Sequence, residues 1–297
     1  MAFGQSYPNK PVRIVTITAG SGIDFTARLI ARALSASLGQ QFIVDNRGSL
    51  ISGEVVSKAP PDGYTLLVDS SSFWLAPLLQ DVPYDPQLSF APVSLLAASP
   101  LILVASPAAP IRSVAELIAL AKANPGVLNY ASGTSGGSGH LTAELFKTMA
   151  GVNIMRVGYK GTVLSYTDLM NGRVHILFES APAVMPLVKA GKITGMAVTT
   201  LQRTVLAPGM PTVAETVPGF EVVSMTSLLA PAKTPTAIVG RLSQEIVRIL
   251  RTPEAKEKLL NAGTDPVGSS PEQLAITIKS EMAKWGKVIK DAGIRAD

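Results

Sequence analysis

The chain has 297 residues, of which 47% are hydrophobic and 16% charged, so it carries enough apolar material for one large or two medium-sized cores. Its net charge is +5 without a run of like charges, and its aromatic content is 5%, which argues against a nucleic-acid partner. Cysteine is absent, which excludes disulfides, thiol nucleophiles and cysteine-bearing metal centres.

The N-terminal part of the chain alternates short β-branched runs with helical stretches, a pattern typical of a parallel sheet covered by helices. Strands are predicted over residues 12–17, 42–45 and 65–69. The helix after the first strand is expected to have Asp24 as its N-cap and to end at Gly39.

A second alternation of strands and helices starts at Ser113, which forms a capping-box motif with Glu116. A strand over 128–131, a loop of Ser, Thr and Gly over 132–139 and a helix over 141–151 follow. Further strands are predicted near 154–157, 174–178 and 193–198, alternating with helices around 165–170 and 184–190.

The last part of the chain offers a strand near 221–225 and then three helices without a strand long enough to build a third sheet. The economical arrangement returns these helices to the first sheet. We therefore predict an α/β fold of two lobes, each a mixed sheet covered by helices, with the ligand cleft between the lobes. The first lobe comprises residues 1–103 with 226–297, the second comprises 104–225, and a hinge lies at the crossing segments near 101–105 and 222–229.

Metal, membrane and export signals are weak. His140 and His175 lie on different predicted elements without the spacing of metal ligands, so we expect neither a metal nor another cofactor. No apolar stretch reaches the roughly 18 to 20 residues of a membrane span. Residues Ala2-Phe3-Gly4 fit the end of a signal-peptide cleavage site, which favours an exported protein in which Met1 replaces the signal peptide.

The loop after the first predicted strand contains Gly20-Ser21-Gly22, which begins like a dinucleotide-binding fingerprint but lacks the third glycine. A glycine turn followed by a helix N-terminus offers free N–H groups and the positive end of the helix dipole to a carboxylate or phosphate. Anion binding and a plain turn into the helix are both open at this loop.

The segment Gly133-Thr134-Ser135-Gly136-Gly137 matches G-x-S-x-G, and Asp168 and His175 follow in the order of an α/β-hydrolase. This is the basis of an alternative function, a serine hydrolase with Ser135 as the nucleophile. The loop is longer than a nucleophile elbow and His175 lies inside an apolar strand. We therefore expect the hydroxyl and N–H groups of this loop to bind a carboxylate without chemistry.

Three further side chains have two interpretations each. Lys160 is either a cationic ligand group or a surface charge at a strand end. Phe73 and Trp74, after the third predicted strand, either cover a ligand or pack beneath the helices of the first lobe, and packing is slightly favoured.

Several ordered motifs run through nearly the whole chain. The first half carries YPNKPVR at 7–13, GSGIDFTAR at 20–28, LGQ at 38–40, VDNR at 44–47 and KAPPDGYTLL at 58–67. The second half carries SGHL at 138–141, ELF at 144–146, YKG at 159–161 and LAPAKTP at 229–235. With these motifs the chain resembles the Bug family, the substrate-binding proteins of tripartite tricarboxylate transporters.

This resemblance implies a periplasmic, two-lobed protein that captures a small carboxylate and delivers it to the permease subunits of the transporter without catalysis. Backbone groups, hydroxyls and ordered waters from loops of both lobes would bind the carboxylate. We expect a monomer. The candidate ligand-binding residues are Ala19, Gly20, Ser21, Asp24, Ser70, Ser71, Phe73, Ser132, Gly133, Thr134, Ser138, Tyr159, Gly161, Thr162 and Glu179.

Two places depart from the family pattern. Residues 48–53 include the bulky Leu50 and Ile51 where the family usually has a small glycine-rich loop, and Gly139 replaces a hydroxyl residue of the family motif. Both changes make the expected pocket less polar. Together with Phe73 and Trp74, they predict a dicarboxylate with a hydrophobic body, either an aromatic acid such as terephthalate or a medium-length aliphatic diacid.

Overall fold

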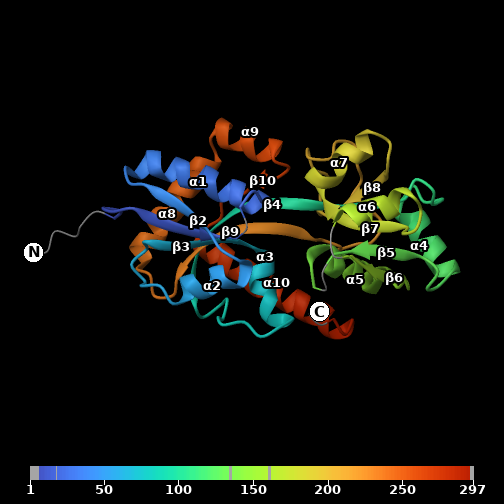
Figure 1. Ribbon diagram of the computed structural model, residues 1–297, viewed down its shortest axis with the longest axis horizontal. Coiled ribbons are helices and arrows are strands. Elements are labelled where there is room, and N and C mark those ends of the chain that lie inside the picture. Colours follow the sequence, from blue (N-terminus) through green and yellow to red (C-terminus); the bar gives the residue numbers. More distant parts are fainter. Residues whose placement is uncertain (1–6, 18, 134–135, 160–161, 295–297) are drawn as a thin grey trace, which may run out of the picture. The chain divides into compact units, whose positions relative to one another are not determined.

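The computed structural model describes residues 7–17, 19–133, 136–159 and 162–294 (Figure 1). The chain divides into two compact units. The first contains the residues up to Ala98 together with Met225–Ala283, and the second contains Ser99–Ser224 together with the residues from Lys284 onward. The chain passes from one unit into the other within β4 (Phe90–Ala105), β9 (Val223–Pro231) and α10 (Pro271–Asp291).

The sheet of the first unit is built on three parallel strands, in the order β2 (Phe42–Asn46), β1 (Val12–Thr16) and β3 (Thr65–Ser70). β9 runs antiparallel beside β3, and β4 follows β9 in the sheet. The short strand β10 (Asp265–Pro266) pairs antiparallel with β4. The sheet is therefore mixed, as the sequence analysis predicts.

Helices lie on both faces of this sheet. The apolar residues of β3 pack against the helices on both faces, because successive side chains of a strand point to opposite faces of the sheet. One face is covered by α1 (Gly22–Leu38), α8 (Thr236–Leu250) and α9 (Pro253–Asn261), and the other by α2 (Ser49–Ser57), α3 (Ser71–Leu75) and the 3-10 helix η1 (Ala76–Leu78) (Figure 1).

The larger core of this unit lies between the sheet and the α1–α8 layer. Its fully buried members include Ile14 of β1, Leu66 of β3, Leu34 of α1 and Leu242 of α8. Burial of a side chain of this size contributes roughly 1.5–3 kcal/mol to stability. This layer holds the ends of β1, β2 and β3 at fixed positions.

The ends of α1 follow local capping chemistry. Ser21 is the N-cap, because its Oγ accepts a hydrogen bond from the backbone N–H of Asp24 at 3.1 Å. The prediction of Asp24 as the N-cap is therefore wrong by three residues, because Asp24 lies in the first turn of the helix. Gly39 ends the helix with φ +72°, as predicted, since glycine adopts this left-handed conformation without strain.

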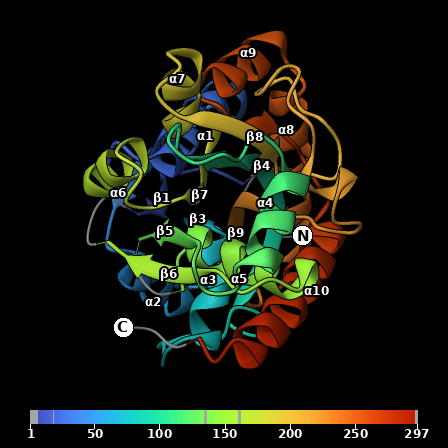
Figure 2. The same cartoon turned by 90° about the vertical axis from the view of Figure 1, so that its right-hand side faces the viewer.

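The second unit contains a mixed sheet in which β4 pairs antiparallel with β7 (Ile176–Ser180) on one side and β8 (Thr194–Val198) on the other. Parallel strands β5 (Asn129–Ser132) and β6 (Met155–Gly158) continue the sheet beyond β7. One face carries α6 (Thr162–Met170) and α7 (Ala181–Lys189), and the other α4 (Val114–Ala123) and α5 (Ser138–Ala150) (Figure 2). The 3-10 helix η2 (Val213–Glu215) follows β8 along the chain.

These elements confirm an α/β architecture in which each unit is a mixed sheet covered by helices. Residues 48–53, expected as a loop, are an exception, because α2 begins at Ser49. Packing decides this: Ser52 and Val56 are buried. Gly53 lets the helix approach closely, since a Cβ there would lie 2.6 Å from the Tyr84 ring. Within the described ranges, no helix has the length and apolar content that a membrane span requires.

Candidate functional site

The candidate residues of the first unit gather at the carboxyl edge of its sheet. β1, β2 and β3 are adjacent and parallel, and they end at Thr16, Asn46 and Ser70. The loops that follow them therefore leave the sheet at the same edge, the usual position of ligand sites in sheets of this kind. This edge carries the glycine loop 19–21 and the β3–α3 junction, which we define as residues 69–72.

Asp24 holds the glycine loop in place. Its Oδ2 accepts hydrogen bonds from the backbone N–H of Gly20 at 2.9 Å and from Nε of Arg28 at 3.0 Å, and its Oδ1 accepts one from Nδ2 of Asn46 at 2.8 Å. The same Asn46 amide also donates to the carbonyl of Ile17 at 2.7 Å. Asp24 is buried beneath the loop that it bonds, whereas Ala19 and Gly20 are exposed to solvent.

The ionised form of Asp24 is the stable one. Desolvation by burial opposes it, but the hydrogen bonds from Arg28, Asn46 and Gly20 lower the pKa of the carboxyl below its ordinary value. Its oxygens are occupied by these donors. Asn46 and Arg28 were not among the candidate site residues, although both lie in the quoted motifs. The i,i+4 spacing of Asp24 and Arg28 on α1 is a local signal for their pairing, whereas only the register of β1 with β2 shows that Asn46 reaches Asp24.

At the β3–α3 junction, Ser70 and Ser71 follow each other at the strand end. Ser70 is buried, and its Oγ lies 2.6 Å from Oγ of Ser72. Ser71 is partly exposed and begins α3. The junction thus presents several hydroxyl groups at the same edge as the glycine loop.

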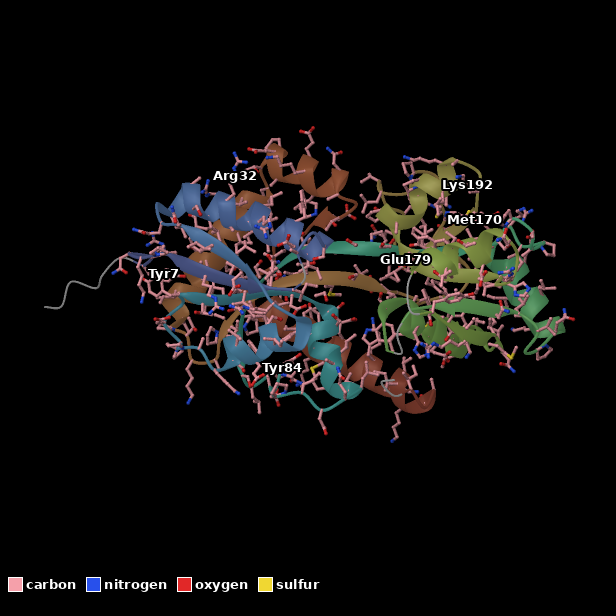
Figure 3. All side chains as sticks on the ribbon, in the orientation of Figure 1. Tyr7, Arg32, Tyr84, Met170, Glu179 and Lys192 are labelled. Carbon is pink, nitrogen blue, oxygen red and sulfur yellow. The ribbon has the colours of Figure 1, made fainter. Side chains whose placement is uncertain are left out.

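Phe73 and Trp74 are packed into the first unit. Phe73 stacks on Tyr84 with ring centroids 4.6 Å apart and meets Phe90 edge-on at 4.9 Å (Tyr84 is labelled in Figure 3). Both Phe73 and Trp74 expose 1% or less of their surface. These contacts correspond to the interpretation in which Phe73 and Trp74 pack inside the first unit and do not cover a ligand. Ile51 on α2 is 54% exposed, and the side chain of Leu50 lies outside the described part.

The second unit repeats this arrangement at the carboxyl edge of β5, β6 and β7, which are parallel to one another. Ser132 ends β5 opposite Gly158 of β6. Arg156 donates from Nε to Oγ of Ser132 at 2.8 Å and from Nη2 to the carbonyl of Gly133 at 2.9 Å. The hydroxyl of Ser132 donates to the Gly133 carbonyl at 3.5 Å, which is long and therefore weak for a hydrogen bond.

Arg156 was missed by the sequence analysis. Arg156 lies two residues before the end of β6. Only the pairing of β5 with β6 shows that this position is close to Ser132 and the loop that follows it. Arg156 is a cation in contact with two candidate residues. A guanidinium group is well suited to a carboxylate partner.

The glycine loop of this unit leads into α5. Ser138 is the first residue of the helix and is exposed, and Nδ1 of the buried His140 accepts a hydrogen bond from the backbone N–H of Gly136 at 3.0 Å. Gly139 allows α5 to lie against β7, because a Cβ there would be 2.8 Å from the carbonyl oxygen of Phe178. Thr134 and Ser135 lie outside the described residues.

Tyr159 and Glu179 complete the described candidates. The Tyr159 hydroxyl donates to Oδ2 of Asp168 at 2.8 Å, and burial together with this bond raises the pKa of Tyr159 to about 12. Glu179, near the end of β7 (Figure 3), accepts from the backbone N–H of Ser180 at 2.7 Å. Burial and the nearby Glu179 also raise the pKa of Tyr166. Lys160 and Gly161 lie outside the described residues, as does the side chain of Thr162.

The serine-hydrolase alternative finds no support in the placement of its members. His175 precedes β7 and pairs with Asn129 at the start of β5, with Nδ1 2.8 Å from the Asn129 Oδ1. It therefore lies at the amino edge of the sheet, roughly 10 Å of strand from the loop that carries Ser135. Asp168 is bonded to Tyr159 and to Arg173 instead.

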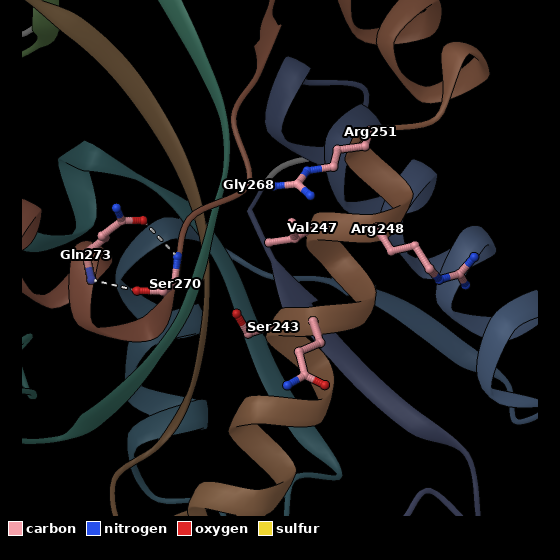
Figure 4. Close-up of a pocket in the computed structure, with 8 residues that line it drawn as sticks. Ser243, Val247, Arg248, Arg251, Gly268, Ser270 and Gln273 are labelled. Carbon is pink, nitrogen blue, oxygen red and sulfur yellow. Dashed lines mark hydrogen bonds between the residues drawn. The ribbon is translucent and has the colours of Figure 1, made fainter.

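A pocket of about 500 Å³ elsewhere in the first unit does not include any candidate residue. It lies between α8 and the segment leading into α10, and Ser270 and Gln273 bond each other in its wall (Figure 4). Within the described residues, no group of three or more His, Asp or Glu side chains is placed to bind a metal ion.

Comparisons with known proteins find similarity over almost the entire chain. A family model described as "Tripartite tricarboxylate transporter family receptor" matches residues 26–294. The protein BugT of Bordetella pertussis is 34% identical over 299 residues, which cover 98% of this chain and 92% of BugT.

Two solved structures extend this similarity. The R. palustris protein Rpa4515, solved with adipate, is 39% identical, has a TM-score of 0.80 and aligns over 97% of this chain and 99% of its own. The periplasmic binding protein BugD is 30% identical, has a TM-score of 0.77 and aligns over 98% of this chain and 100% of its own.

Proposed function

Because the chain belongs to the family of tripartite tricarboxylate transporter receptors, we propose that it binds a dicarboxylate in the periplasm and passes it to the membrane subunits of such a transporter. The observation that carries this proposal is the family match over residues 26–294. Similarity to a periplasmic binding protein supports the location, and the family's receptor role supports binding without catalysis.

The proposed binding elements are the loops at the carboxyl edges of the two sheets. In the first unit they offer the exposed backbone of Ala19 and Gly20 and the hydroxyls of Ser21, Ser70 and Ser71. In the second they offer the groups of Ser132, Gly133 and Ser138, with Arg156 as an added cation. Converging N–H and O–H groups can replace the hydration shell of a carboxylate. Thr134, Gly161 and Thr162 belong to the proposal on the resemblance alone.

Two candidates have a supporting role in this proposal. The oxygens of Asp24 are occupied by donors of its own loop, and the hydroxyl of Tyr159 is donated to Asp168. We assign them to positioning the loops. Glu179 is an acceptor, so it would suit a hydroxyl or protonated group of the ligand and not a carboxylate.

The proposed ligand is an aliphatic dicarboxylate of the adipate type. Support comes from the adipate-bound protein, which is 39% identical over 97% of this chain. An aromatic dicarboxylate such as terephthalate is the second candidate. It needs an apolar wall. The burial of Phe73 and Trp74 leaves Ile51 as the exposed apolar side chain among those members of the predicted wall whose side chains the structure describes.

Calorimetric titration with adipate, terephthalate and citrate tests this proposal. We expect adipate to bind at least tenfold more tightly than citrate, whose central hydroxyl and third carboxylate need partners that an aliphatic diacid does not. If terephthalate binds most tightly, the ligand is an aromatic and not an aliphatic dicarboxylate. Tightest binding of citrate would contradict the dicarboxylate proposal, and turnover of activated esters without binding of any acid would contradict the receptor function.

A matched pair of variants locates the site. Ser132→Ala removes one hydroxyl from the proposed site and should weaken adipate binding by roughly 10- to 100-fold, since hydrogen bonds to charged groups contribute about 1.5–3 kcal/mol. Ser280→Ala removes an exposed hydroxyl on α10 that bonds the carbonyl of Thr277 and should leave the affinity unchanged. Equal affinities of both variants would remove the β5 loop from the site.

A further inference from the structure

A buried carboxylate lies directly behind the β3–α3 junction. Asp69 exposes 0% of its surface and precedes Ser70 on β3. Its Oδ1 accepts a hydrogen bond from the backbone N–H of Ser70 at 2.7 Å, and its Oδ2 accepts one from Oγ of Ser52 on α2 at 3.1 Å. Both donors are neutral. Asp69 therefore differs from Asp24, whose carboxylate is paired with the guanidinium of Arg28.

The elements around Asp69 carry charged groups that are engaged elsewhere. Glu54 of α2 is paired with Lys58, and Arg13 of β1 is paired with Asp45. α3, η1 and β9 contain no ionisable residue. On the other face of the sheet, α1 carries Asp24 and Arg28, which bond each other, and Arg32.

Tyr84 is a titratable group whose pKa depends on the charge of Asp69. Burial raises the pKa of Tyr84, and the charge of Asp69 raises it further. Burial likewise raises the pKa of Asp69 to about 7, although the hydrogen bonds from Ser70 and Ser52 oppose the shift. Both protonation states of this carboxyl are thus accessible near neutral pH.

A partner for the neutral form is at hand on the adjacent strand. Asp69 is directly opposite Ser227 of β9, so the two side chains lie on the same face of the sheet. Oγ of Ser227 is buried and has no hydrogen-bond partner in the described part of the chain. A protonated carboxyl has an O–H group to donate. Ser227 Oγ does not bond the Asp69 carboxyl in this structure, so a change of rotamer at one of the two side chains would bring this acceptor into reach.

We propose that Asp69 takes up a proton from solvent when the carboxylate ligand binds at the β3–α3 junction, so that ligand binding is coupled to proton uptake. This inference rests on the proposed function, in which Ser70 and Ser71 contact the ligand. An anion bound one or two residues from Asp69 makes a second negative charge in this buried place less favourable. The ligand therefore binds the protonated form more tightly, and by linkage binding draws a proton onto Asp69.

Titration calorimetry of adipate at pH 7 in buffers with different ionisation enthalpies measures this proton. The wild-type protein should take up a measurable fraction of a proton per ligand, because part of Asp69 is ionised at this pH before binding. Asp69→Asn, which is similar in shape and does not titrate, should abolish the uptake. Asp62→Asn, at the turn before the other end of β3, is the matched control and should keep it.

A second variant covers the case in which Asp69→Asn fails to fold. Ser52→Ala removes a donor to the ionised carboxylate, which raises the pKa of Asp69, so the pH at which proton uptake is greatest should move upward. Binding heat in any one buffer tests the proposed function, whereas the dependence on buffer tests this inference. Adipate binding without proton uptake would overturn the inference alone. So would uptake that persists in Asp69→Asn and disappears in His140→Gln, since His140 lies beside the other glycine loop.

Discussion

At the scale of residues, the candidate site is organised by polar side chains that act on the loops from behind. Asn46 joins Asp24 to the carbonyl of Ile17, and Arg156 joins Ser132 to Gly133. Each of these links spans neighbouring strands whose residues are distant in sequence. These links hold the loops in place, and the loops' own N–H groups take part: that of Gly20 donates to Asp24 and that of Gly136 donates to His140.

Arg156→Gln should weaken adipate binding by about 10- to 100-fold. The substitution removes the charged donor that orients Ser132 and Gly133, and hydrogen bonds to charged groups contribute about 1.5–3 kcal/mol. Arg203→Gln is the control, because Arg203 pairs with Glu215 in an exposed segment of the same unit. Titration calorimetry of both variants measures the effect, and a wild-type affinity in Arg156→Gln would remove this cation from the site.

Asp69→Asn should raise stability in a pH-dependent way. Asp69 ionises near 3.8 in the unfolded chain and near 7 in the folded protein, so between these values the folded state binds more protons. Wild-type stability therefore falls as pH rises from about 4 to about 7 and is then level with respect to this group. Asparagine has no such penalty, so its advantage grows over this window by up to a few kcal/mol.

Denaturant unfolding of both proteins at pH 5 and pH 8 checks this difference. The gain in unfolding free energy of Asp69→Asn over the wild type should be larger at pH 8. A gain that is equal at the two pH values, or larger at pH 5, would show that Asp69 ionises in the folded protein as it does in the unfolded chain.

At the scale of elements, local chemistry places the helix ends and close packing places the helices. Ser113 caps α4 by accepting from the backbone N–H of Glu116, as the capping-box motif predicts, but the Glu116 carboxylate bonds the N–H of Arg112 instead of returning to Ser113. Beginning at Ser49, α2 has a weak apolar periodicity, and its position follows from contacts with Tyr84 and Phe73 at Gly53. Such contacts are not visible in a local pattern.

Gly139→Ala should destabilise the second unit by roughly 1–3 kcal/mol. The added methyl group would lie 2.8 Å from the carbonyl oxygen of Phe178, so α5 must shift away from β7. Gly240→Ala in α8 is the matched control: its Cβ would meet nothing within 4 Å, and alanine is favoured over glycine in a helix by roughly 0.5–1 kcal/mol. Denaturant unfolding should give effects of opposite sign, and a stabilising Gly139→Ala would contradict the close approach.

At the scale of the whole molecule, two units of the same kind each present loops at the carboxyl edge of parallel strands. Each sheet places its candidate residues at this edge, and the histidine of the hydrolase motif falls at the opposite edge of the second sheet. The topology of the second sheet therefore separates His175 from the loop that follows β5, although the order of these residues in the sequence permits a catalytic triad.

Hydrogen exchange of backbone amides, measured with and without adipate, should show protection by the ligand in both units. Backbone amides of residues 19–24 and 70–72 in the first unit, and of 136–140 and 158–159 in the second, should exchange more slowly with ligand. The amides of residues 173–175, at the amino edge, and of 243–251, beside the pocket in Figure 4, should not change. Protection confined to one unit would limit the site to that unit's loops.

The sequence by itself determined the α/β class, the alternation of elements, helix ends such as those at Gly39 and Ser113, and the family, because these depend on neighbouring residues or on motifs a few residues long. Tertiary structure alone decided which side chains meet. It buried Phe73 and Trp74, joined Arg156 to Ser132 and placed His175 at the wrong edge for catalysis. It also gave the Asp69 carboxylate neutral hydrogen-bond donors, Ser70 and Ser52, in the part of the chain that the structure describes. The physical reason is that strand pairing brings together residues some 20 to 160 positions apart, as with Ser132 and Arg156 or Asp69 and Ser227.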